Sequence, residues 1–186
     1  MGTMKKPTVS LFRRMKNEGR KIVMLTAYDA PTAKLAQECG IDIILVGDSL
    51  GMAVLGYQNT LPVTLEQSLH HCAAVRRGAP DAFVIGDMPF MTCHASETDA
   101  LKNAARYLQE AQCDAVKIEG DAALAPTVER MVHAGIPVMG HIGLLPQHIK
   151  TSGVYRVTGR KEEEAERIIA DAKAMEAAGV FAMVLE

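Results

Sequence analysis

The sequence predicts an α/β fold built on a parallel sheet. Six apolar, β-rich segments alternate with helical segments along the 186 residues, and this alternation is typical of βαβ units. One of the segments, residues 41–47, is an almost unbroken run of Ile, Leu and Val, which indicates a strand buried on both faces of the sheet. Hydrophobic residues make up 48% of the chain, enough for a substantial core.

Strands are expected at residues 21–28, 41–47, 82–88, 115–120, 137–142 and 181–186. Helices are expected between them at residues 30–39, 64–77, 96–111, 122–134 and 161–178, with loops at residues 49–63 and 144–159. Two helix starts carry clear capping signals. Asp29 precedes a Pro in the first turn, and Thr64 with Gln67 forms a capping box.

Two architectures are compatible with this order of elements. An open, doubly wound sheet uses five or six strands and would be complete at this length. A (β/α)8 barrel needs eight strands and typically about 250 residues. No GxGxxG sequence follows the first strand and no P-loop sequence occurs, so no nucleotide-binding signal favours the doubly wound sheet.

Charge and composition argue against several classes of function. The net charge is −2, and nucleic-acid binding needs a dense basic surface. The densest basic cluster, Arg13, Arg14 and Lys16, is interpreted as the solvated face of a helix. No apolar stretch approaches the ~20 residues of a membrane helix, so no membrane partner is expected. The four cysteines form no CxxC pair, and we expect reduced thiols in a cytoplasmic protein.

Ionisable residues recur at the carboxyl ends of the predicted strands. Asp48, Asp87, Glu119 and Glu186 each lie at or near the end of a different strand, and His141 does the same on a fifth. The carboxyl ends of parallel strands share one rim, where active sites form. We therefore expect these residues to converge. A single Asp after a strand can instead be a helix cap, which is our interpretation of Asp29.

Asp48 and Asp87 are not followed directly by a predicted helix, so capping does not explain them. A cluster of carboxylates without Cys or paired His favours a hard cation such as Mg²⁺. Lys117 and Glu119 lie two residues apart on a strand and share a face. They could form an internal ion pair, or they could bind an anionic substrate and a metal. His141 could be a hydrogen-bonding residue of the rim or a ligand.

Seven motifs resemble the ketopantoate hydroxymethyltransferase family, and they occur in the order that the family has. They are VGDSLG (46–51), TLPVT (60–64), AVRRGAP (74–80), GDMPF (86–90), VKIEG (116–120), GHIGLLPQ (140–147) and VLE (184–186). The resemblance runs from about Pro7 to the last residue. It implies a TIM barrel of the phosphoenolpyruvate mutase and isocitrate lyase type, and a large homo-oligomer, often a decamer.

The resemblance also implies a reaction. A one-carbon transferase of pantothenate biosynthesis would move a hydroxymethyl group from 5,10-methylenetetrahydrofolate to 3-methyl-2-oxobutanoate, giving 2-dehydropantoate. The keto acid would chelate Mg²⁺, and the cation would stabilise the enolate that forms when the C3 proton leaves. A carboxylate base on the same rim would take that proton. Two alternatives stay open: another 2-oxo-acid lyase or mutase of the same superfamily, and an inactive fragment of the transferase.

Residue roles carry over by the same resemblance. Asp48 and Asp87 match the Mg²⁺ ligands, Glu119 matches a third acidic residue at the metal, and Glu186 matches the proton acceptor. The keto acid would be contacted by Asp48, Ser49, Asp87 and Lys117.

This chain departs from the family pattern in two places. Gly153-Val154 replaces a Gly-Gly pair that is typical of the family, which affects a turn in the loop before Arg156. The predicted strands number about six, whereas the family's barrel has eight. We therefore expect residues 1–186 to form a single barrel domain that is truncated at its C-terminus.

Overall fold

The computed structural model describes residues 6–186, which contain one six-stranded, all-parallel sheet in the order β1-β2-β3-β4-β5-β6. The strands are β1 (Met24–Thr26), β2 (Ile43–Val46), β3 (Phe83–Asp87), β4 (Ala115–Glu119), β5 (Val138–Ile142) and β6 (Ala182–Leu185). Five of them match the predicted segments closely. The first strand is shorter than predicted, because only three residues pair with β2.

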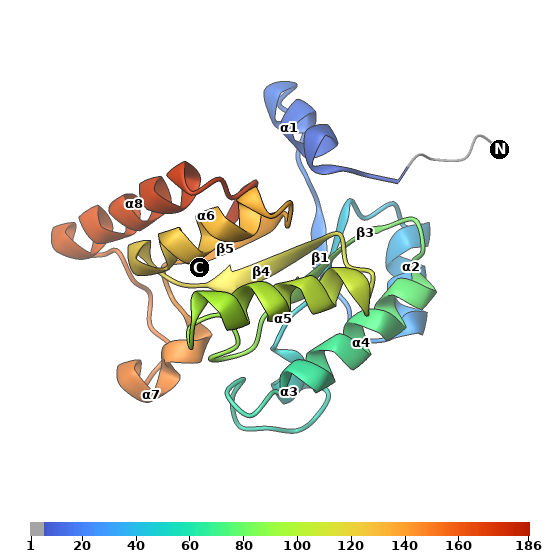
Figure 1. Ribbon diagram of the computed structural model, residues 1–186, viewed down its shortest axis with the longest axis horizontal. Helices are drawn as coiled ribbons and strands as arrows, with labels where there is room; N and C mark the ends of the chain where they lie inside the picture. Colours follow the sequence, from blue (N-terminus) through green and yellow to red (C-terminus); the bar gives the residue numbers. More distant parts are fainter. Residues whose placement is uncertain (1–5) are drawn as a thin grey trace.

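The strand order decides between the two predicted architectures. Each strand pairs with the next one in the sequence, so the sheet always grows in one direction, whereas a doubly wound sheet reverses direction near its middle. Right-handed crossovers then place every connecting helix on the same face. Figure 1 shows this row of helices. They are α2 (Ala30–Glu38), α4 (Leu65–Gly78), α5 (Glu97–Gln109), α6 (Ala125–His133) and α8 (Glu162–Ala177).

Alternate strand residues form two separate cores. Outward-facing residues such as Ile44, Val84 and Val116 pack against the row of helices in the larger core. Inward-facing residues such as Ile43, Phe83, Ile85, Ala115 and Met139 form the smaller core on the other face. Because side chains alternate along a strand, the inward series continues into Asp87 on β3 and into Lys117 and Glu119 on β4.

Helix α1 (Val9–Asn17) covers the amino-terminal part of the inward face, and the sequence did not place a bounded element there. Phe12 and Met15 are buried in the smaller core. The Phe12 ring meets Phe83 edge-on, with centroids 4.9 Å apart and an interplanar angle of 89°. The opposite side of α1 carries Arg13, Arg14 and Lys16, which are exposed, so their interpretation as a solvated helix face is confirmed.

Predicted helix starts are confirmed by their hydrogen bonds. The Asp29 carboxylate accepts from the Thr32 N–H at 2.8 Å. Thr64 and Gln67 form the complete capping box, with backbone N–H to side-chain distances of 3.2 and 2.9 Å. Each cap satisfies backbone donors that have no partner within the helix.

The two predicted loops are only partly irregular, which corrects the sequence analysis. Residues 49–63 contain the short helix α3 (Leu50–Ala53), and residues 144–159 contain the 3₁₀ turn η2 (Pro146–His148) and helix α7 (Ile149–Ser152). Another 3₁₀ turn, η1 (Ala122–Leu124), precedes α6. Gly153 ends α7 with φ of 72°, a left-handed conformation that favours glycine. The first glycine of the family's pair is therefore the one that this turn needs.

Within residues 6–186, every helix is too short or too polar to cross a lipid bilayer.

Gly86 on β3 has no room for a side chain, and its neighbour is Asp87. A Cβ at this position would lie 2.2 Å from Cδ1 of the buried Tyr107 ring. We expect Gly86→Ala to lower the free energy of unfolding by about 2 kcal/mol, because Tyr107 must move. The matched control is Gly140→Ala on β5, where the nearest atom to the new Cβ is 3.4 Å away. Urea titrations should show a change within about 0.5 kcal/mol for the control; equal losses in both variants would contradict this packing argument.

Candidate active site

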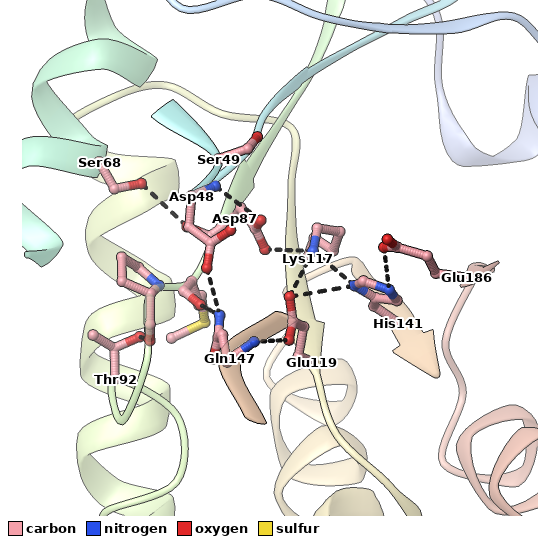
Figure 2. A network of polar contacts seen from close by, with 12 residues as sticks. Asp48, Ser49, Ser68, Asp87, Thr92, Lys117, Glu119, His141, Gln147 and Glu186 are labelled. Carbon is pink, nitrogen blue, oxygen red and sulfur yellow. Dashed lines mark hydrogen bonds and ion pairs between the residues drawn. The ribbon is translucent and has the colours of Figure 1, made fainter. Parts of the chain in front are cut away.

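Charged and polar side chains from four neighbouring strands converge at the carboxyl rim of the sheet (Figure 2). The strand register brings them together: Asp87 pairs with Lys117 across β3 and β4, and Glu119 pairs with His141 across β4 and β5. Asp48 follows β2 and donates its backbone N–H to Asp87 Oδ2 at 3.0 Å. All five residues are 4% exposed or less. The predicted convergence of these strand-end residues is confirmed.

Lys117 lies at the centre of this cluster. Its Nζ is 2.8 Å from Asp87 Oδ1, 3.2 Å from His141 Nδ1 and 3.9 Å from Glu119 Oε1. A buried ammonium is unfavourable unless charges and acceptors compensate it, and here the neighbouring strands supply both. The internal ion pair that the sequence left as an alternative is therefore present, and it includes Asp87 as well as Glu119.

Gln147 is a member of the site that the sequence analysis did not single out. Its side-chain Nε2 donates to Asp48 Oδ2 at 2.9 Å and to the Met88 carbonyl at 3.1 Å. Its backbone N–H donates to Glu119 Oε2 at 3.0 Å. Gln147 lies in η2, within the GHIGLLPQ motif, and that motif was the only sequence signal that could have found it.

Asp87 and Ser49 are held in place from outside the rim. The buried hydroxyls of Ser68 and Tyr107 donate to the Asp87 backbone carbonyl at 3.1 and 2.8 Å. Ser49 lies directly before α3, and its hydroxyl is 2.9 Å from the Tyr28 hydroxyl. The helices α4 and α5 therefore fix the end of β3, and the segment after β1 fixes the Ser49 side chain.

Glu186 joins the site through His141. Its backbone N–H donates to the Ile142 carbonyl at 3.3 Å, and its own carbonyl accepts from the Leu144 N–H at 3.0 Å. These bonds place its side chain at the rim, where Oε2 is 3.2 Å from His141 Nε2. The Glu186 side chain is 50% exposed, in contrast to the buried residues of the cluster.

Burial and charge give the carboxyl groups different acidities. Burial, together with the like charge of Asp87, raises the pKa of Asp48 to about 8 in spite of the Lys117 ammonium. Burial also raises the pKa of Asp87, against the opposing effect of Lys117. Burial alone would raise the pKa of Glu119, but its contacts with His141, Lys117 and Gln147 outweigh it and lower the pKa. Without a cation beside it, Asp48 therefore holds its proton more strongly than an exposed aspartate does.

Lys117 keeps its charge. Burial alone would lower the pKa of its ammonium, but the carboxylates of Asp87 and Glu119 more than compensate, and the pKa is raised.

A cavity of about 440 Å³ opens in front of these groups. This volume is in the range of small-molecule sites. Its polar lining consists of Asp48, Ser49, Thr60, Asp87, Lys117, Glu119, His141, Tyr155 and Glu186, and its apolar lining includes Met24, Leu45, Met52, Leu144 and Val184. Every residue that the sequence predicted for the site lines this one cavity.

The residues fit a divalent cation held mainly by two carboxylates. With Asp48, Asp87 and Glu119 ionised, their three negative charges exceed the single positive charge of Lys117 by two. Asp87 Oδ1 is buried and, although it lies near the ammonium, has no aligned hydrogen bond within residues 6–186. In the same part of the chain, no three His, Cys, Asp or Glu side chains gather closely enough to hold a metal together. Mg²⁺ commonly uses one or two carboxylates and takes its other oxygens from water and substrate.

A family model described as ketopantoate hydroxymethyltransferase matches residues 6–186. The chain belongs to this family. It is 54% identical to the 3-methyl-2-oxobutanoate hydroxymethyltransferase of Shouchella clausii (strain KSM-K16) over 179 residues. The matched segment covers 96% of this chain and 64% of that protein. The enzyme of the same name from Desulfotalea psychrophila (strain LSv54 / DSM 12343) is 55% identical over 183 residues, 98% of this chain and 65% of its own length. The chain therefore spans slightly less than two thirds of these curated relatives.

Solved structures of other enzymes have the same arrangement of elements as this chain. A 2,3-dimethylmalate lyase, described as a PEP mutase/isocitrate lyase superfamily member, has a TM-score of 0.68 at 20% identity and covers 97% of this chain and 62% of its own. A phosphonopyruvate hydrolase in complex with oxalate and Mg²⁺ has a TM-score of 0.70 at 15% identity, with coverages of 97% and 63%. The likeness shows the fold, an α/β arrangement whose six described parallel strands are consistent with part of the predicted barrel.

The raised pKa of Asp48 makes stability depend on pH. Between its ordinary pKa of 3.8 and about 8, the group is protonated when folded and ionised when unfolded. Its contribution to stability therefore falls as pH rises through this window, by on the order of 1 kcal/mol per pH unit, and stays low above it. In urea titrations with EDTA, the free energy of unfolding of Asp48→Asn should rise relative to that of the wild type from about pH 5 to about pH 8.

The control for this experiment is Asp81→Asn, because Asp81 is exposed and distant from the rim. We expect its stability difference from the wild type to be constant across the same pH range. A constant difference for Asp48→Asn as well would contradict a buried, protonated Asp48.

Proposed function

We propose that this protein transfers a hydroxymethyl group from 5,10-methylenetetrahydrofolate to 3-methyl-2-oxobutanoate and so forms 2-dehydropantoate. The observation that carries the proposal is the cavity in which Asp48, Asp87, Lys117 and Glu186 face one another. These are the residues that the family resemblance assigns to the metal, the keto acid and the proton. Relatives with 54% and 55% identity bear the name of this enzyme.

Asp48 and Asp87 would hold Mg²⁺, with Glu119 as the third acidic residue at the metal. Glu119 already accepts from the Gln147 N–H and lies beside Lys117 and His141. It would therefore lie farther from the cation than the two aspartates do. When bound, the cation supplies positive charge that stabilises the enolate of the keto acid. The phosphonopyruvate hydrolase in complex with oxalate and Mg²⁺ supports this choice, because oxalate, like the keto acid, can bind a cation through two oxygens.

Lys117 and Ser49 would bind and orient the keto acid. Both line the cavity next to the two aspartates, and each carries a hydrogen-bond donor that suits a carboxylate or oxo oxygen. The apolar part of the lining, with Leu45, Met52 and Val184, suits the branched aliphatic end of the substrate.

Glu186 would be the proton acceptor. Its carboxylate is half exposed and lines the same cavity as Asp48 and Asp87. It would remove the C3 proton, and the C3–H electron pair would stay on the substrate as the enolate. The enolate carbon would then form a bond to the one-carbon unit of the folate. Water would supply the hydroxyl group of that unit, and tetrahydrofolate would leave as the two carbon–nitrogen bonds to the unit break. We also propose that the protein forms a homo-oligomer, a decamer by the family resemblance, and that it is located in the cytoplasm.

The same fold also supports a second candidate, a lyase or mutase acting on a 2-oxo acid, because the structural neighbours include a 2,3-dimethylmalate lyase. The two candidates differ in which bond breaks. A transferase breaks the C3–H bond of the keto acid, whereas a lyase breaks a carbon–carbon bond. Exchange of the C3 proton of 3-methyl-2-oxobutanoate with D₂O favours the transferase, and an inactive fragment would catalyse neither reaction.

Asp87→Ala tests the assignment of the metal and keto-acid site. We expect the wild type to form 2-dehydropantoate from 3-methyl-2-oxobutanoate, Mg²⁺ and 5,10-methylenetetrahydrofolate, and the variant to lose at least about 1,000-fold of kcat/KM. Asp81→Ala is the control, since this exposed carboxylate lies away from the rim, and it should keep full activity. Product formation is followed by mass spectrometry. Unchanged turnover in Asp87→Ala would contradict the assignment of Asp87 to the metal and keto-acid site.

A further inference from the structure

His141 connects the buried cluster to the exposed base, and no role in the reaction has so far been given to it. Its ring is 3% exposed and lies on β5, in register with Glu119. Nδ1 faces the cluster, 3.2 Å from Lys117 Nζ and 3.4 Å from Glu119 Oε1. Nε2 faces the other way, 3.2 Å from Glu186 Oε2 (Figure 2). We propose that His141 is the positioning residue that holds the Glu186 carboxylate for proton abstraction.

The contacts of Nδ1 determine which ring nitrogen carries the proton. The Lys117 ammonium has only donors, so a hydrogen bond at 3.2 Å makes Nδ1 its acceptor. This contact is shorter than the 3.4 Å from Nδ1 to Glu119 Oε1, and Glu119 Oε2 already has a donor in the Gln147 N–H, so we assign Nδ1 as the acceptor for Lys117. A neutral imidazole that accepts at Nδ1 carries its proton on Nε2. The Nε2–H group therefore points toward Glu186. An ionised carboxylate has only acceptor atoms, so Glu186 accepts from Nε2. The charge of Lys117 thus sets the tautomer, and the tautomer sets the partner of Glu186.

Nε2 needs the partner that Glu186 provides. This nitrogen is buried and has no aligned hydrogen bond within residues 6–186, although Glu186 Oε2 lies within reach. A buried donor without an acceptor is unfavourable by roughly 1–3 kcal/mol. Glu186 Oε2 is 3.2 Å away on a half-exposed side chain, so it is the acceptor within reach of Nε2. The cost of leaving Nε2 unpaired therefore favours the single orientation of Glu186 in which Oε2 accepts from His141.

The consequence concerns the other oxygen of Glu186. With Oε2 held by His141, Oε1 is the oxygen left to take the C3 proton, while the electron pair of the broken bond stays on the keto acid. This inference rests on the proposed function, because it assigns the orientation of the base in that reaction. A general base contributes fully only when it is held within hydrogen-bond reach of its proton.

Two substitutions of His141 separate its two contacts. His141→Gln places an amide nitrogen near the position of Nε2 and keeps a donor for Glu186. His141→Asn is shorter, and its amide reaches the position of Nδ1, so an acceptor for Lys117 is kept and Glu186 loses its donor. Each variant therefore keeps one buried polar contact: the Gln variant keeps the contact with Glu186, and the Asn variant keeps the contact with Lys117. Thermal melts compare their folding with that of the wild type.

The readout is exchange of the C3 proton of 3-methyl-2-oxobutanoate with D₂O, measured by ¹H NMR with Mg²⁺ and without folate. We expect His141→Asn to slow exchange by about 100-fold with KM changed less than about threefold, as for a misplaced base. We expect His141→Gln to stay within about fivefold of the wild type. In the background of Glu186→Gln, His141→Asn should cause no further loss, because the two residues act as one unit.

The outcomes separate the role of His141 from the proposed function. A wild type that catalyses neither exchange nor transfer overturns the proposed function and this inference with it. A wild type with normal exchange and an unimpaired His141→Asn variant overturns the inference alone, as does equal impairment of the Asn and Gln variants. Long-range ¹H–¹⁵N NMR of the wild-type imidazole needs no variant: protonation at Nε2 is the expected result, and protonation at Nδ1 with a bare Nε2 overturns the assignment.

Discussion

The burial of one ammonium group is the constraint on which the site depends. Lys117 is 4% exposed, and a charge so far from water must be compensated by its neighbours. Asp87, Glu119 and His141 provide that compensation at 2.8, 3.9 and 3.2 Å. Their own orientations are fixed in turn by Gln147, by the Asp48 N–H and by hydroxyls from the helices. The cluster therefore forms as a unit. When its three carboxyl groups are ionised, their negative charge exceeds the positive charge of Lys117, as the proposed divalent cation beside Asp48 and Asp87 would require.

The parallel sheet is what makes such a unit possible. Strands that grow in one direction place their carboxyl ends on one rim, and the register aligns Asp87 with Lys117 and Glu119 with His141. The same alternation sends Ile44, Val84 and Val116 outward into the helical core, so stability and chemistry use opposite faces of the same strands. Helix α1 covers the smaller core below the rim, which leaves the cavity at the carboxyl ends.

Much of this was predictable because it depends on local patterns. Alternating apolar segments defined the strands, and the position of each acid at the end of its strand predicted the rim. Two other features depend on contacts between segments far apart in the chain. Gln147 reaches Asp48 across 99 residues through the η2 turn, and no pattern around Gln147 sets that direction. The placement of His141 between Lys117 and Glu186 follows only from the register of β4, β5 and β6.

Asp48 and Asp87 are proposed to hold a divalent cation beside the buried Lys117, and every other assigned role in the site depends on that cation. Crystals soaked with Mn²⁺ and 3-methyl-2-oxobutanoate test it most directly, because Mn²⁺ accepts the oxygen ligands of Mg²⁺ and gives an anomalous signal. We expect one strong anomalous peak within coordination distance of carboxylate oxygens of both Asp48 and Asp87, with the keto acid beside it and Lys117 still paired with Asp87. A peak elsewhere in the molecule, with neither aspartate in contact, would contradict the account.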